Sequence, residues 1–122
     1  MQVIYIAGKY RDSSEYKVRM NIRKAEAAAL FVWQSGGVAI CPHKNTAGFG
    51  GACGTDESVW LKGDLELLDR SNAIWLIPGW QSSEGARQEA QRAADRDMVI
   101  LSSKAEVLSY LRDGVVPSGL FP

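Results

Sequence analysis

The clearest chemical signal in the sequence lies between Ser83 and Glu89. An apolar run and the break Pro78-Gly79-Trp80 precede this segment, and small and polar residues of helical character follow it. The order of strand, tight loop, serine and helix places backbone N–H groups at a helix N-terminus, where an anion binds readily. Glu89 lies further into the same helix, within reach of a group held there. An anion-binding site beside a carboxylate suggests chemistry on a nucleotide. The structural alternative for the same pattern is an N-capped helix with a solvated glutamate.

Asp64 is the second candidate, because it lies on the apolar side of its predicted helix. The apolar residues that surround its position are Trp60, Leu61, Leu65, Leu67 and Leu68. A carboxylate on a core-facing stripe is costly unless it is paired, and its pKa should be raised. Such carboxylates gather at functional sites, although an aspartate that holds a loop or pairs with an arginine is also compatible. With Glu89, at the border of the stripe Ala86, Ala90, Ala93 and Ala94, it would supply a nucleophile and a general acid, as in glycoside cleavage.

The end of the first apolar run offers a second anion contact. Gly8 would allow close backbone approach there, and Lys9 and Arg11 add local positive charge where a phosphate could lie. Tyr5 alternates with core residues along the same run, so a purely structural role would also explain it.

Three aromatic or polar residues could contact a base. His43 is the one histidine of the chain, and a single imidazole without a second ligand makes metal binding improbable. We expect His43 to make a polar contact with a ligand or a loop, or to be structural. Trp60 and Trp80 could stack on a base, and Trp60 could equally belong to the core.

Alternating strands and helices must position these residues. The predicted strands are Val3–Ala7, Val38–Cys41, Ala73–Ile77 and Met98–Leu101. The predicted helices run from about Ser14 to Gln34, Glu57 to Arg70, Glu84 to Arg96 and Ser103 to Arg112. This pattern predicts an α/β fold of three layers, with a flavodoxin-like parallel sheet of four or five strands flanked by helices and ligands at the strand C-termini.

Two further expectations follow from the same pattern. The apolar arc predicted for the first helix comprises Val18, Ile22, Ala25, Ala29, Val32 and Trp33. The long connection Pro42–Asp56, with Gly48, Gly50, Gly51 and Gly54, is typical of a lid or a binding loop.

Composition limits the classes of function. At 122 residues, the chain is long enough for one domain, spanning residues 1–122. The formal net charge of zero does not indicate a broad basic surface that would bind nucleic acid or an anionic membrane. Cys41 and Cys53 lack metal-ligand spacing and fit free thiols in a reducing cytosol. With no leader-like or membrane-spanning segment, we expect a cytoplasmic location.

In this order, the motifs resemble those of the nucleoside 2-deoxyribosyltransferase-like superfamily, which includes the 2′-deoxynucleoside 5′-phosphate N-hydrolases. The matching motifs are Tyr-Ile-Ala-Gly, Pro-His, an acidic helix, Pro-Gly-Trp and Ser-x-Gly-Ala-x-x-Glu. The resemblance runs from Tyr5 to about Leu101 and is closest to small, often phage-borne members. Two features depart from it: Asn72 stands where many members carry an aspartate, and the Gly-rich loop after His43 has no counterpart.

The resemblance implies a set of roles. Glu89 would be the nucleophile that attacks the anomeric carbon, Asp64 would assist at the base or sugar, and Tyr5 would be the active-site tyrosine. The family's 5′-phosphate contacts match the positions Gly8, Arg11, Ser83 and Gly85. The expected reaction is hydrolysis of a nucleoside 5′-monophosphate to free base, without metal or organic cofactor. Base transfer, or nucleotide binding without catalysis, are the alternatives.

The resemblance also predicts a homodimer or a higher homo-oligomer, because relatives commonly complete the pocket with residues of a neighbouring subunit. The apolar tail Val115–Pro122 is the segment expected to bury against the partner.

Overall fold

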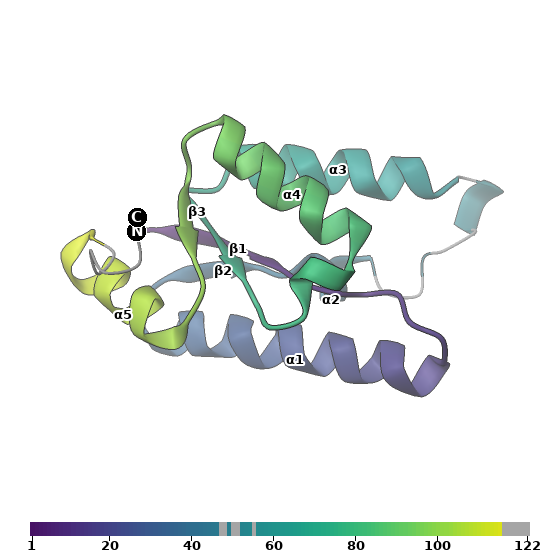
Figure 1. Cartoon of the computed structure of the whole chain (residues 1–122), viewed down its shortest axis with the longest axis horizontal. Helices are drawn as coiled ribbons and strands as arrows, with labels where there is room; N and C mark the ends of the chain where they lie inside the picture. The colour runs from purple at the N-terminus through teal and green to yellow at the C-terminus, as the bar shows by residue number, and fades with distance from the viewer. Residues whose placement is uncertain (47–48, 50–51, 55, 116–122) are drawn as a thin grey trace.

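A parallel sheet forms the centre of the computed structural model, which describes residues 1–46, 49, 52–54 and 56–115. Its strands are β1 (Val3–Ala7), β2 (Val38–Ile40), β3 (Ala73–Leu76) and β4 (Val99–Leu101). They pair in the order β2-β1-β3-β4, with Val3 opposite Val38 and Ile4 opposite Ala73 (Figure 1). This order confirms the predicted three-layer, flavodoxin-like α/β fold, with four strands in the described part of the chain.

Capping side chains fix the starts of the long helices. The helices are α1 (Glu15–Gln34), α2 (Pro42–Asn45), α3 (Glu57–Asp69), α4 (Glu84–Asp95) and α5 (Lys104–Asp113). The residues that cap α1, α3, α4 and α5 by accepting a hydrogen bond from a backbone N–H are Ser14, Asp56, Ser83 and Ser103. Such side chains satisfy N–H groups that have no partner inside the helix. The four predicted helices are confirmed to within about a residue at each end.

The connection after β2 is more regular than predicted. It begins with the short helix α2, with Pro42 at the first helical position, and contains the 3-10 turn η1 (Ala52–Gly54). Proline is favoured at that position, because its fixed φ suits the helix and its missing N–H would have had no partner. Gly48, Gly50 and Gly51 of the predicted loop lie outside the described residues.

Helices cover both faces of the sheet, and alternate residues of each strand point to opposite sides. The helices α1 and α5 lie on one side of the sheet and α3 and α4 on the other (Figure 1). Ile4 and Ile6 of β1 pack on the side of α1 and α5, whereas Tyr5 and Ala7 pack on the side of α3 and α4. This alternation follows from the period of two in a strand. Tyr5 is therefore on the face whose helices carry Asp64 and Glu89.

Two residues of the predicted apolar stripes are exposed. Trp33 retains 55% of its surface, and Ala94 is also exposed, whereas the preceding residues Val32 and Ala93 are fully buried. Consecutive residues on a helix diverge by about 100°, and the buried arc of each helix is too narrow to include both. The predicted core stripes of α1 and α4 were too wide by one residue each.

An exposed ion pair joins α3 to α4 near their C-terminal ends. Arg92 Nε donates to Asp69 Oδ1 at 2.8 Å, and Arg96 Nε lies 3.4 Å from the same oxygen. This contact ties together the two helices that carry the candidate carboxylates.

Asn72 joins β1 and β3 at their N-terminal ends. Its side-chain Oδ1 accepts a hydrogen bond from Val3 N–H at 2.7 Å, and its own N–H donates to the Val3 carbonyl at 2.8 Å. Asn72 therefore has a structural role, at the edge of the sheet opposite the strand C-termini.

The chain reverses its direction of winding at β1, from which it first moves to β2 and later returns to β3 on the other side. In open parallel sheets, ligands bind at such a switch point, beyond the C-terminal ends of the strands. Within the described residues, no helix is both long and apolar enough to cross a membrane. The predicted partner contact, Val115–Pro122, lies outside the described residues except for Val115, which is exposed.

Candidate active site at the strand C-termini

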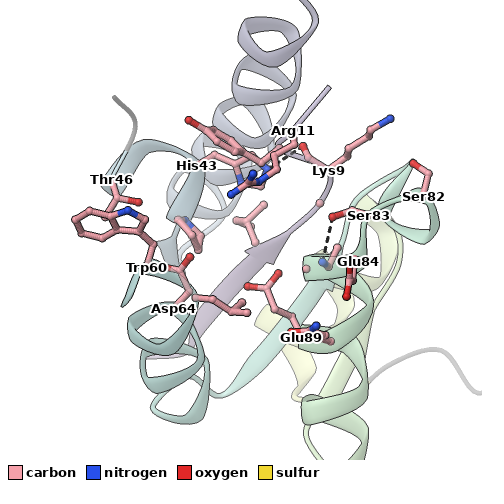
Figure 2. A pocket seen from close by; sticks show the side chains of 18 of the residues that line it. Lys9, Arg11, His43, Thr46, Trp60, Asp64, Ser82, Ser83, Glu84 and Glu89 are labelled. Carbon is pink, nitrogen blue, oxygen red and sulfur yellow. Dashed lines mark hydrogen bonds between the residues drawn. The ribbon is translucent and has the colours of Figure 1, made fainter. Parts of the chain in front are cut away.

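A cleft of about 900 Å³ opens at the C-terminal ends of β1 and β3. Its walls come from the segment after β1, from α2 and α3, and from the start of α4 (Figure 2). The volume lies within the usual range for small-molecule sites. Nine sequence-predicted residues line it: Gly8, Lys9, Arg11, His43, Trp60, Asp64, Ser83, Gly85 and Glu89.

Glu89 is the most deeply placed carboxylate of the cleft. It is only 8% exposed, and its Oε2 accepts a hydrogen bond from the hydroxyl of Tyr5, which is fully buried in β1. Burial raises the pKa of Glu89 to about 7, the Tyr5 hydrogen bond acts in the opposite direction, and the Asp64 charge adds to the rise. Burial also raises the pKa of Tyr5, as does the neighbouring Glu89. Tyr5 is therefore a neutral donor that favours the ionised form of Glu89.

Asp64 faces Glu89 from the other helix. Both carboxylates are directed into the same cleft, Asp64 from α3 and Glu89 from α4 (Figure 2). Partial burial raises the pKa of Asp64 to about 6, as its position on the apolar side of the helix predicted. Because the two carboxyl groups interact, they titrate as a pair, and the apparent pKa values belong to the pair rather than to either residue.

The start of α4 forms the wall of the cleft beside Glu89. Ser83 Oγ accepts a hydrogen bond from Ala86 N–H at 3.2 Å, and the Ser83 carbonyl accepts from Arg87 N–H at 2.9 Å. The N–H groups of Glu84 and Gly85 precede this first helical bond, where a helix presents donors to an anion.

Gly85 also leaves space that a side chain would fill. A Cβ at this position would lie 3.9 Å from Ser83 Oγ, an ordinary van der Waals distance. Glycine near the start of a helix costs stability relative to alanine, and packing within the protein does not require it here. The missing side chain keeps the backbone at the start of α4 open to the cleft.

Gly8 lines the cleft, and its lack of a side chain also serves packing. A Cβ at Gly8 would lie 2.5 Å from Ile77 Cγ1, so packing between the ends of β1 and β3 requires the glycine. Close approach to a ligand is not needed to explain it.

The positive charge after β1 is also partly neutralised. Lys9 Nζ lies 3.4 Å from Asp12 Oδ2, and its side chain extends away from Asp64 and Glu89 (Figure 2). Arg11 lines the cleft as the second cation of this segment.

His43 connects two walls of the cleft. It is buried, and its Nε2 lies 3.0 Å from the carbonyl oxygen of Lys9, so the ring nitrogen donates. Burial lowers the pKa of His43, while its hydrogen bonds to backbone groups of Lys9 and Gly8 act in the opposite direction. The Tyr10 ring packs edge-on against it at 5.7 Å. Of the two predicted alternatives, this is the polar contact with a loop.

The two predicted tryptophans differ. Trp60 lines the cleft from α3 and has the Phe49 ring edge-on at 5.9 Å, and its buried Nε1 has no hydrogen-bond partner. Trp80 lies in η2 (Trp80–Ser82) and packs against the core between the sheet and α4, outside the residues that line the cleft. Trp80 therefore does not line this cleft.

Several cleft residues were not predicted as site residues. They are Tyr10, Pro42, Thr46, Ser58, Ser82, Glu84 and Gln88. Most of them are neighbours in sequence of a predicted residue, so a prediction that included the whole segment after each strand would have found them. Ser58 and Thr46 carry no comparable signal, because the path between α2 and α3 decides their position.

Among the described residues, no group of three or more His, Cys, Asp or Glu side chains is arranged to hold a metal ion. Cys41 is a half-buried free thiol whose pKa is raised by burial.

The fold and the cleft together define a parallel α/β domain with one buried and one partly buried carboxylate at its switch point. The chain belongs to the family described as Domain of unknown function (DUF7768), whose model matches residues 2–103. The match begins just before β1 and extends past β4, so it includes every residue named above as lining the cleft. The chain has no significant match among curated proteins.

Proposed function

We propose that this protein hydrolyses the N-glycosidic bond of a nucleoside 5′-monophosphate, with a 2′-deoxyribose sugar, and releases the free base. The observation that carries the proposal is the arrangement of Tyr5, Glu89 and Asp64. A buried carboxylate accepts a hydrogen bond from a neutral tyrosine and shares its cleft with a second carboxylate of raised pKa. Glycosidases divide their chemistry between two carboxyl groups in this way.

In the first step, ionised Glu89 attacks C1′ while the bond from C1′ to the base nitrogen breaks. The leaving base takes a proton from Asp64 and departs neutral, and the sugar phosphate remains bound to Glu89 as an ester. In the second step, water attacks C1′, Asp64 accepts the proton, and the ester bond breaks. Glu89 is then a carboxylate again and Asp64 is protonated, so protons and electrons balance.

The division of roles determines which protonation state of the carboxyl pair reacts. The first step needs Glu89 ionised and Asp64 protonated. The Tyr5 hydroxyl stabilises the negative charge on Glu89, and no comparable donor stabilises a charge on Asp64 among the hydrogen bonds of the described residues. With a pKa of about 7 for Glu89 and about 6 for Asp64, the single proton of the pair resides more often on Glu89, so the reactive arrangement is the less populated one, and the Tyr5 hydrogen bond narrows the difference between the two pKa values.

The start of α4 suits a 5′-phosphate. Ser83, the open backbone at Gly85 and the helix N-terminus provide donors on the same side of the cleft as Glu89. A nucleotide substrate and a free thiol fit the cytoplasm, which we propose as the location.

The test is a chromatographic screen of the common ribonucleoside and deoxyribonucleoside 5′-monophosphates for released base. Wild-type protein should release base, and Glu89→Gln should bind the nucleotide but lose at least about a thousandfold in kcat, equivalent to roughly 4 kcal/mol of barrier. Glu66→Gln, on the exposed side of α3, is the matched control and should keep full activity.

Three outcomes would contradict the proposal. Release of base by Glu89→Gln at the wild-type rate would exclude a nucleophilic role for this carboxylate. Tight nucleotide binding without base release from any monophosphate would indicate a binding protein. Faster reaction in the presence of a second free base, with a new nucleotide formed, would indicate a transferase.

A further inference from the structure

Asn21, near the start of α1, is a buried polar residue to which the reaction above gives no role. Its side chain is 8% exposed, on the same buried side of the helix as Ala25, Ala28 and Val32. Burying an amide costs free energy unless it forms hydrogen bonds, so its contacts indicate what it is for.

Both contacts of the Asn21 amide nitrogen are with the segment that joins β1 to α1. Nδ2 donates to the Tyr10 carbonyl at 3.2 Å and to Asp12 Oδ2 at 3.4 Å. These acceptors belong to the residues immediately before and after Arg11. Asn21 thus holds the backbone on one side of Arg11 and a side chain on the other.

The same segment is fixed from a second direction and carries an internal ion pair. His43 donates to the Lys9 carbonyl at 3.0 Å, and Asp12 Oδ2 lies 3.4 Å from Lys9 Nζ. Asp12 Oδ1 also accepts from Ser13 N–H at 2.8 Å. The Asp12 carboxylate that pairs with Lys9 is therefore also the one that Asn21 holds.

We infer that Asn21 is a positioning residue that holds Arg11 at the cleft for the anionic group of the substrate. The contacts at Lys9, Tyr10 and Asp12 surround Arg11, whose side chain lines the cleft. The segment is therefore ordered before a ligand binds. Because its conformational entropy is already lost in the free protein, ordering the segment does not reduce the binding free energy of the anion. This inference rests on the proposed function for the identity of the anion, a nucleotide 5′-phosphate.

The test compares Asn21→Leu with Val32→Thr. The first change keeps a side chain of similar size and removes both hydrogen bonds to the segment. The second also disturbs a fully buried position of α1, but away from the segment, and controls for loss of stability. Each variant is measured for binding of inorganic phosphate, nucleosides and nucleoside monophosphates, and for hydrogen exchange of the backbone amides of residues 9–13.

Asn21→Leu should weaken phosphate and monophosphate binding at least tenfold, leave nucleoside binding within twofold, and speed exchange at Ser13. KM for the monophosphate should rise by the same factor with little change in kcat. Val32→Thr should lower the urea midpoint without changing either affinity or the exchange of residues 9–13.

Phosphate affinity that stays at the wild-type value in Asn21→Leu would overturn the inference, whether or not the exchange rates change. Equal losses for nucleoside and monophosphate, or a similar loss in Val32→Thr, would also overturn it, since they indicate a general structural role. Wild-type protein that releases no base but gives the expected binding and exchange results would contradict only the proposed hydrolysis.

Discussion

Glu89→Gln should change how the stability of the protein depends on pH, independently of any activity. Burial raises the pKa of Glu89 from 4.5 to about 7 in the folded protein. Between these two values, the folded state keeps a proton that the unfolded chain has lost, so the free energy of unfolding falls as the pH rises. Glutamine has nearly the same shape and no charge to desolvate, so this part of the pH dependence should disappear.

The size of the effect follows from the same numbers. Each pH unit between the two pKa values corresponds to about 1.4 kcal/mol. Ionising Glu89 in the folded protein therefore costs on the order of 3 kcal/mol, fully present above about pH 7 and absent below about pH 4.5. The partial burial of Asp64 acts in the same direction but is common to both proteins.

Urea unfolding, followed by circular dichroism at intervals from about pH 4 to pH 8, measures this difference. Carboxylates with lowered pKa values, such as Asp69, destabilise both proteins equally in acid and cancel in the comparison. The free energy of unfolding of Glu89→Gln, relative to wild type, should increase by about 3 kcal/mol across this range. Glu66→Gln should follow the wild type. A relative stability of Glu89→Gln that is constant with pH would refute the claim that Glu89 is desolvated in the folded state.

Three other outcomes are expected. The rate of base release should be bell-shaped in pH, rising as the carboxyl pair loses its first proton and falling as it loses the second, with a maximum between the two apparent pKa values near 6 and 7. Asp64→Asn should abolish the alkaline limb, and a wild-type rate that is flat from pH 5 to 8 would contradict the assignment. Gly8→Ala should destabilise the protein by about 1–3 kcal/mol, because the new methyl group collides with buried Ile77. Wild-type stability of Gly8→Ala in urea would show that this contact relaxes freely. In sedimentation equilibrium the protein should be a homodimer that becomes monomeric when residues 115–122 are removed, whereas a monomer at all concentrations would contradict the predicted tail contact.

Periodicity was sufficient to predict the fold and the central residues of the site. The period of two in β1 places Tyr5 and Ala7 on one face, and the helical period places Asp64 on the apolar side of α3. The carboxyl ends of parallel strands lie along one edge of the sheet. The sequence pattern alone therefore predicts that residues following different strands lie close together at this edge. Glu89 joins them because Ser83 fixes the start of α4.

Features that depend on the path of loops could not be predicted. Gly8 is required by Ile77, which approaches it only because β1 and β3 are neighbours in a particular register. The side on which Trp80 packs depends on the turn at Gly79, where φ is 94°. Asn21 resembles any polar helix residue in the sequence, since its partners are set by the fold of the preceding segment.

The position of Tyr5 has a consequence for laboratory evolution. Among the described residues it is the largest fully buried side chain, and it is also the donor to Glu89. A library screened only for heat resistance would favour substitutions that remove the buried charge or its polar neighbour, because an apolar or uncharged interior is easier to pack. Such winners would retain the fold and lose the carboxylate chemistry. Selection for stability and selection for turnover should therefore favour different residues at positions 5 and 89. Sequencing the variants from both selections would identify residues that the protein retains at the expense of its own stability.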